Sequence, residues 1–262
     1  MKKVLAIILS LVFVLTMATV SFAGSSTITA EDYDWTVGFI TSWPVDPAMT
    51  QMGRAKECFT MMKDKVAAGT VSVVLADQAT YTTNRQYETG FYFMADVTPV
   101  KEGEAVTGAT VNDAYLVTLN SQTHDVVLYR VTAGAKESLA SANINTLFEL
   151  ADPAAIGNVT LEAVFTADGE VTVNATCQDQ NKKVLDYTED ASAPAGDDVV
   201  LYSLFAEWTT ANAGDADNAQ IADYSATAEN PEMGDTTAIV AVVAIVALLG
   251  CGVAFTASKK RI

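Results

Sequence analysis

Hydrophobic and polar residues alternate with a period of two along most of the chain after Val71. The clearest segments are rich in β-branched and aromatic residues, and they are 71–76, 90–97, 114–119, 126–131, 159–165, 171–176 and 199–205. Because successive side chains of a strand point to opposite faces, each segment is predicted to be a β-strand. Short polar connections join them, and Asp168-Gly169 is typical of a tight hairpin turn. Many strands with short hairpins predict an all-β fold, an antiparallel β-sandwich of the jelly-roll type.

Residues 49–66 allow two interpretations. Their apolar residues recur at three- and four-residue steps, and they are Met49, Met52, Ala55, Phe59, Met62 and Val66. This spacing favours an amphipathic helix with a methionine-rich stripe packed into the core. The run 58–62 is also compatible with a strand that leads into 71–76, so the sequence leaves helix and strand both open, with the helix favoured.

Both ends of the chain carry uncharged apolar runs. Residues 1–23 begin with Lys2 and Lys3 and end with the small residues Ser21 and Ala23, a pattern typical of a signal peptide cleaved after Ala23.

At the other end, residues 236–258 are uncharged, and the apolar run within them spans about 27 Å as a helix, which is close to the thickness of a bilayer core. The basic tail 259–262 follows and predicts a cytoplasmic C-terminus, with residues 24–229 forming one extracellular domain.

A short motif separates this domain from the predicted transmembrane helix. It consists of Asn230, Pro231, Glu232, Met233, Gly234 and Asp235. Together with the span and the basic tail, it resembles the LPxTG-type cell-wall sorting signal of Gram-positive surface proteins, in the variant that begins with Asn-Pro and ends with Gly-Asp. The resemblance implies cleavage by a sortase before Gly234 and transfer to peptidoglycan, although Met233 stands where the family has Thr. A plain single-pass anchor is the alternative, and both place the domain at the outer face of the membrane or the cell wall.

Composition excludes several classes of function. The 262 residues include 15 Lys and Arg against 32 Asp and Glu, a formal net charge of −17, which argues against nucleic acid as a partner. A single histidine, His124, cannot build a histidine-rich zinc site. Only Cys58 and Cys177 lie outside the predicted span. They could form one disulfide, and the sequence does not show whether they are close, but a domain of this size does not need one, so unpaired thiols are favoured.

The order of the predicted strands carries a second resemblance. The segments that carry it are 87–97, 114–119 paired with 126–131, 161–165, Asp168-Gly169, 171–173, 196–205 and 219–224. Over roughly residues 71–227, this order is similar to that of concanavalin-A-like lectin/glucanase domains, the laminin-G-like jelly rolls. The resemblance implies a sandwich that either binds carbohydrate or hydrolyses it.

Catalytic patterns are weak in this chain. Glucanases of the resembled fold place acids at alternate positions of one strand, and no Glu-x-Asp-x-Glu run exists here. Glu102 and Glu104 flank a glycine in a predicted loop, and Asp168 and Glu170 flank a turn. His124 lies in a hairpin connection and is expected to be an exposed turn residue. The chain is therefore predicted not to be an enzyme.

Binding is the favoured function. Trp208 and Trp43 are the candidates for stacking against a sugar ring, and Asp215, Asp217 and Asn218 are candidate ligands for Ca²⁺, the one cofactor that the sequence suggests. The sequence thus predicts a surface-anchored binding or adhesion module for an extracellular glycan. A glycoside hydrolase and a purely structural envelope protein are the alternatives.

Overall fold

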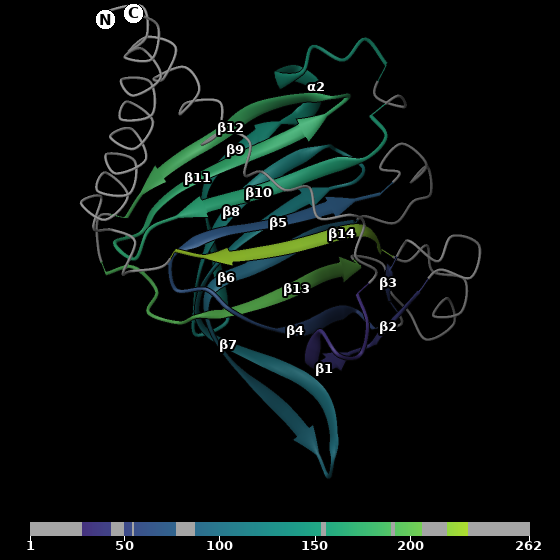
Figure 1. Ribbon diagram of the computed structural model, residues 1–262, viewed down its shortest axis with the longest axis vertical. Helices are drawn as coiled ribbons and strands as arrows, with labels where there is room; N and C mark the ends of the chain where they lie inside the picture. The colour runs from purple at the N-terminus through teal and green to yellow at the C-terminus, as the bar shows by residue number, and fades with distance from the viewer. Residues whose placement is uncertain are drawn as a thin grey trace, which may run out of the picture.

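The computed structural model describes residues 28–42, 50–53, 55–76, 87–152, 156–189, 192–205 and 219–229, which form two packed antiparallel β-sheets (Figure 1). Sheet A has the order β1 (Tyr33–Val37), β4 (Glu57–Lys65), β13 (Asp198–Phe205), β6 (Tyr87–Glu102), β7 (Ala105–Asn120), β8 (Asp125–Thr132) and β9 (Ala135–Asn143). Sheet B has the order β12 (Gln180–Thr188), β11 (Glu170–Cys177), β10 (Val159–Phe165), β5 (Gly69–Leu75), β14 (Ala219–Ala228), β3 (Thr50–Gly53) and β2 (Phe39–Ser42). A short helix, α2 (Ile144–Leu147), follows β9. The predicted antiparallel β-sandwich is confirmed.

All seven strands predicted from alternation are present, as β5, β6, β7, β8, β10, β11 and β13. The predicted turn between β10 and β11 is also present, and Gly169 adopts a φ of 85° there. Glycine reaches this left-handed region without steric cost, which explains the residue choice. In β5 and β10 one face packs into the core while the other is less buried, which is the pattern that alternation predicts. In β6, β7 and β13 the predicted segments are buried on both faces, and their β-branched and aromatic residues identified them as strands.

The helix favoured for residues 49–66 is wrong, since this segment forms β3 and β4. In β4, Cys58 and Met62 belong to the core between the sheets, whereas Phe59 and Met61 belong to an apolar cluster on the opposite face of sheet A. A strand that is buried on both faces reads as a continuous apolar run, so its sequence lacks the alternation of a half-exposed strand.

The main core lies between the two sheets and is centred on aromatic rings. Phe93 of sheet A lies 4.6 Å, between ring centroids, from Phe165 of sheet B, and it also packs against Tyr115 and Phe91. All four side chains are buried. These contacts hold the two layers in register through apolar burial.

Sheet A also buries side chains on its outer face. This outer cluster consists of Val37, Phe59, Met61, Tyr92, Ala95, Val97, Val111, Ala114, Leu116, Val131, Val200 and Tyr202. Strands β1 and β7 are in contact although three strands separate them in the sheet order, so sheet A curls around this face. Because the sheet curls, side chains on its outer face pack against one another and form a second apolar cluster.

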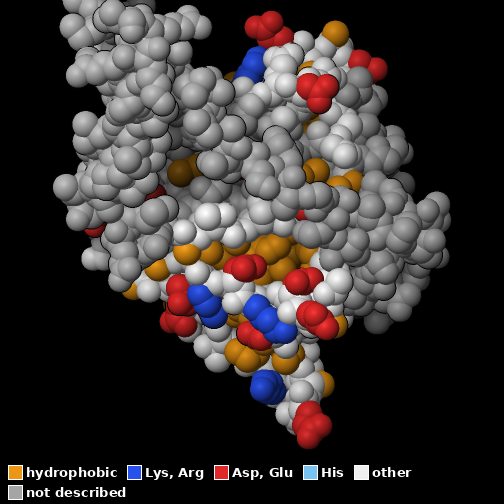
Figure 2. Space-filling view, viewed as in Figure 1, with side chains coloured by type: hydrophobic (Ala, Val, Ile, Leu, Met, Phe, Trp, Pro, Cys, Tyr) orange, Lys and Arg blue, Asp and Glu red, His pale blue; other side chains and the backbone are white. Residues whose placement is uncertain are grey.

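Strands β6 and β7 extend beyond their neighbours as a two-stranded arm. Strand β13 pairs with β6 as far as Ala95, and β8 pairs with β7 from Asp113 onward, so the rest of the hairpin projects from the sandwich (Figure 1). Acidic side chains lie at its tip (Figure 2), where Glu102 and Glu104 are exposed as predicted. A band of hydrophobic side chains lies near the base of the arm in the same view.

The structure corrects the prediction that His124 is an exposed turn residue. His124 is buried, with 6% of its surface exposed. Helix α2 packs back over the β7–β8 connection: the Ile144 amide donates to the His124 carbonyl at 2.9 Å, and Asn145 Oδ1 lies 3.0 Å from His124 Nδ1. Helix α2 begins twenty residues after His124 in the sequence. The residues of the turn therefore do not predict that a helix covers this histidine.

Cys58 and Cys177 are free thiols, as expected, and both are buried. Burial raises the pKa of the Cys58 thiol to about 12, and burial also raises the pKa of Cys177. Both groups therefore remain protonated and unreactive at neutral pH.

The predicted targeting segments, residues 1–23, 230–235, 236–258 and 259–262, lie outside the described residues. Within the described part of the chain, no helix has the length and apolar character needed to cross a membrane.

Candidate functional site

The binding residues predicted from sequence fall in segments that the structure does not describe. Trp43 and Trp208 lie outside the described ranges, as do the predicted calcium ligands Asp215, Asp217 and Asn218. The described ranges hold no cluster of three metal-ligating side chains. Of the weak catalytic pairs, Asp168 and Glu170 are exposed at their turn, as expected.

Aromatic residues gather on the outer face of sheet A. Tyr202 stacks obliquely on Phe59 and edge-on against Tyr92, with ring centroids 5.4 and 5.2 Å apart. The Tyr202 hydroxyl donates to Glu57 Oε1 at 2.9 Å and accepts from Lys136 Nζ at 2.6 Å.

Burial together with the neighbouring Tyr92 and Glu57 raises the pKa of Tyr202, and burial lowers the pKa of Lys136. Tyr202 is 0% exposed and Tyr92 is 2% exposed, so these aromatic residues form part of a packed core and offer no surface to a ligand.

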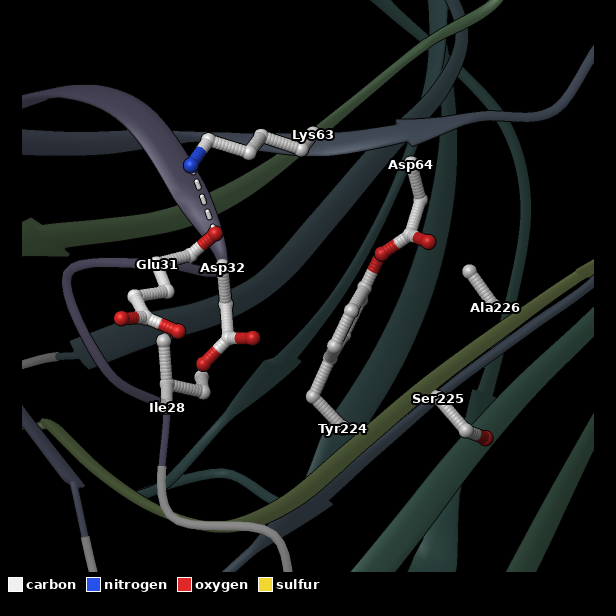
Figure 3. A pocket seen from close by; sticks show the side chains of 8 residues that line it. All are labelled: Ile28, Glu31, Asp32, Lys63, Asp64, Tyr224, Ser225 and Ala226. Atoms are coloured by element: carbon white, nitrogen blue, oxygen red, sulfur yellow. Dashed lines mark hydrogen bonds between the residues drawn. The ribbon is translucent and has the colours of Figure 1, made fainter.

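A cavity of about 310 Å³ lies between the two sheets and the turn that precedes β1 (Figure 3). Its lining residues are Ile28, Glu31, Asp32, Lys63, Asp64, Tyr224, Ser225 and Ala226. We call it the tyrosine cavity. A cavity of about 270 Å³ is lined by Ala95, Asp96, Asp113, Ala195, Gly196, Asp197 and Asp198, and one of about 420 Å³ by Ile156, Gly157, Asn158, Thr160, Thr176, Gln178 and Asp179. Neither of these two has an aromatic ring among its described lining residues, so the tyrosine cavity alone of the three offers a flat apolar wall.

Strand β14 supplies that wall. Ile221 and Tyr224 are three residues apart, so in a regular strand their side chains would point to opposite faces. A β-bulge between Ile221 and Asp223 changes this alternation, and both side chains pack against the main core. The Tyr224 hydroxyl then donates to Asp64 Oδ2 at 2.9 Å, which joins sheet B to sheet A. Burial and the charge of Asp64 raise the pKa of Tyr224, so its hydroxyl stays a donor at neutral pH.

The turn before β1 supplies the opposite side. Asp32 Oδ2 accepts from the Thr29 amide at 2.7 Å and from the Thr29 hydroxyl at 2.8 Å. The Lys63 amide donates to the Asp32 carbonyl at 3.0 Å, and Lys63 Nζ donates to the Glu31 carbonyl at 2.6 Å. These bonds fasten the turn to β4. In Figure 3 the Tyr224 ring is seen edge-on, with one face toward Asp32 and Ile28.

Sequence reasoning missed this site. Its polar groups come from the turn before β1, the end of β4 and the second half of β14, and the hydrogen-bonded pair Asp64 and Tyr224 is 160 residues apart. The sequence identifies Tyr224 only as part of the closing strand, because the residues around it carry no binding motif.

No protein-family model and no curated protein matches this chain. Among solved structures, it is similar to the metal-free carbohydrate recognition domain of Emp46p, with a TM-score of 0.50 and 8% identity over 74% of this chain and 87% of the other. It is also similar to a legume lectin-like domain from Entamoeba histolytica, with a TM-score of 0.46 and 11% identity over 78% and 94% of the two chains. A β-glucanase from Bacillus licheniformis follows, with a TM-score of 0.39 and 9% identity over 72% and 82%. The likeness to the Emp46p domain agrees with the β-sandwich fold of this chain, and a shared fold does not by itself identify a function.

Proposed function

We propose that this chain is a non-catalytic glycan-binding module on the extracellular face of a Gram-positive cell, and that the tyrosine cavity holds one sugar unit. The observation that supports this proposal is the pairing of an aromatic wall, Tyr224, with the carboxylates of Asp32 and Asp64 in one cavity. Its volume of about 310 Å³ lies at the small end of the range for ligand pockets and suits a single ring.

The two kinds of group match the two surfaces of a pyranose. The ring has an apolar face of C–H groups, which packs well against an aromatic side chain. Its hydroxyl groups donate hydrogen bonds, and carboxylates are strong acceptors for them. Lys63, also in the lining, adds a donor for the ring and hydroxyl oxygens.

A glycoside hydrolase is the second candidate, because Glu31, Asp32 and Asp64 line one cavity. Hydrolysis needs a carboxylic acid that holds a proton to give to the leaving group. Asp32 and Asp64 instead accept hydrogen bonds from Thr29 and Tyr224. This arrangement favours binding over proton donation. Release of reducing sugar from any bound glycan would overturn the non-catalytic assignment.

Screening the full chain in detergent on a glycan array tests the proposal. Tyr224→Ala is expected to weaken binding at least tenfold, since the sugar loses its apolar wall, and Tyr224→Phe is expected to keep most of it. The array is read with and without Ca²⁺, because Asp215, Asp217 and Asn218 are the ligands that the sequence predicts for this ion.

Tyr187→Ala provides the control, because Tyr187 is a half-buried tyrosine on β12 that lines none of the three cavities. Circular dichroism establishes that each variant is folded. Binding that survives Tyr224→Ala in a folded protein would remove this cavity from the proposal, and an array without any bound glycan would favour the structural alternative.

We further propose that much of the protein stays anchored in the membrane through residues 236–258. A sortase pocket that hydrogen-bonds the Thr hydroxyl of its motif would be left with an unpaired polar group by Met233, at a cost of about 1–3 kcal/mol. Cell fractionation followed by muramidase digestion and immunoblotting is expected to find full-length, detergent-soluble protein that retains residues 259–262. Protein that ends at Met233 and is released only by muramidase would show that the sortase accepts Met.

A further inference from the structure

The tyrosine cavity carries more negative than positive charge. Among its described lining residues there are three carboxylates, those of Glu31, Asp32 and Asp64, and one ammonium group, that of Lys63. That ammonium donates to the Glu31 main-chain carbonyl at 2.6 Å, and the ion pairs found among the described residues do not include Lys63. This main-chain bond holds the Lys63 ammonium group at the turn before β1, as Figure 3 shows. The cavity therefore favours a ligand that brings a positive charge.

The aromatic wall selects the same sign of charge. The face of a tyrosine ring carries negative electrostatic potential and attracts an ammonium group placed over it. One face of the Tyr224 ring is directed toward Asp32 across the cavity (Figure 3). A cation between them would contact the ring on one side and a carboxylate on the other.

The rest of the chain reinforces this preference. A net charge of −17 produces a negative potential around the whole molecule, which draws cations in and repels anions. An acidic sugar would bring a carboxylate against Asp32 and Asp64. A neutral sugar would satisfy the acceptors with its hydroxyl groups only, whereas an ammonium group offers three donors and a full charge.

Resting on the proposed function of glycan binding, we infer that the sugar unit held in the tyrosine cavity is an amino sugar with a free ammonium group, as in glucosamine. The ammonium lies between the Tyr224 ring and the carboxylate of Asp32, and the hydroxyl groups of the sugar donate to Asp64 and Glu31. Acetylation of the amine removes the charge, so N-acetylated units bind less tightly.

Calorimetric titration of the full chain in detergent at pH 7 with four monosaccharides tests this inference. Glucosamine is expected to bind at least ten times more tightly than glucose and N-acetylglucosamine, and glucuronic acid is expected to show no binding. The preference for glucosamine should shrink as the salt concentration rises, because salt screens charge pairs that solvent reaches. Glucosamine binding no tighter than glucose binding would overturn the inference.

Two charge-removing variants sharpen the test. Asp32→Asn is expected to weaken glucosamine binding at least fivefold while glucose binding changes less than twofold. If Asp32→Asn does not fold, Glu31→Gln at an exposed residue replaces it, and the same selective loss of glucosamine binding is expected. Asp186→Asn, at an exposed carboxylate on β12, is the matched control. Equal loss for both sugars in the cavity variants would contradict a charge-based preference.

The results separate this inference from the proposed function. If Tyr224→Ala weakens the binding of glucose and glucosamine alike and the two sugars bind equally, the cavity is a glycan site without selectivity for an ammonium group. If none of the four sugars binds and the array is also empty, both proposals are wrong.

Discussion

Replacing Phe93 with alanine is expected to lower the free energy of unfolding by about 3–5 kcal/mol. The Phe93 side chain is 0% exposed, and its ring lies 4.6 Å from Phe165 and 5.5 Å from Tyr115, between centroids. Phe93 belongs to sheet A and Phe165 to sheet B, so the substitution leaves a cavity where the two layers meet. Urea denaturation followed by circular dichroism measures the change.

Val164→Ala is the control for this prediction, since Val164 lies on β10 next to Phe165 but is 38% exposed. Its side chain loses little buried area, so a change below about 1 kcal/mol is expected. Similar losses for the two variants would show that the contact between Phe93 and Phe165 does not hold the sheets together.

Arg130→Met is expected to destabilise the fold by about 3–5 kcal/mol, because it leaves a buried carboxylate without its cation. Arg130 Nε lies 3.5 Å from Glu189 Oε2, and the Glu189 side chain is only 8% exposed. Arg130 also pairs with Asp113 and lies 5.5 Å from the centroid of the Tyr115 ring. Urea denaturation at pH 7 measures the loss.

Two comparisons decide whether charge is the cause. Adding Glu189→Gln to Arg130→Met removes the unpaired charge and is expected to restore part of the stability. Lys183→Met breaks an ion pair with Asp186 whose partners are 57% and 54% exposed, and it is expected to cost at most about 1 kcal/mol. An equal cost for Lys183→Met and Arg130→Met would contradict the role of burial.

Local alternation was a sufficient signal wherever one face of a strand remained partly exposed. Strands β5, β10 and β11 alternate between buried and half-buried positions, and all three were predicted. The same reasoning failed for β4, because its residues from Cys58 to Met62 are all buried and the apolar residues around them also recur at the three- and four-residue steps of a helix. It also failed for His124, because the helix that covers this residue belongs to a later part of the chain.

The amino-acid sequence by itself determined the fold class of this protein, since the period of two and the turn at Asp168 and Gly169 are local properties of the chain. It also determined the acidic net charge. For Cys58 and Cys177 the sequence only favoured unpaired thiols, and the structure shows both to be free. Only the tertiary structure decided where a ligand can bind. The tyrosine cavity joins the N-terminal turn, β4 and β14, and its bond between Tyr224 and Asp64 links positions 160 residues apart. Such contacts depend on how two sheets pack and where a bulge turns a strand, and neither is encoded in the pattern of neighbouring residues.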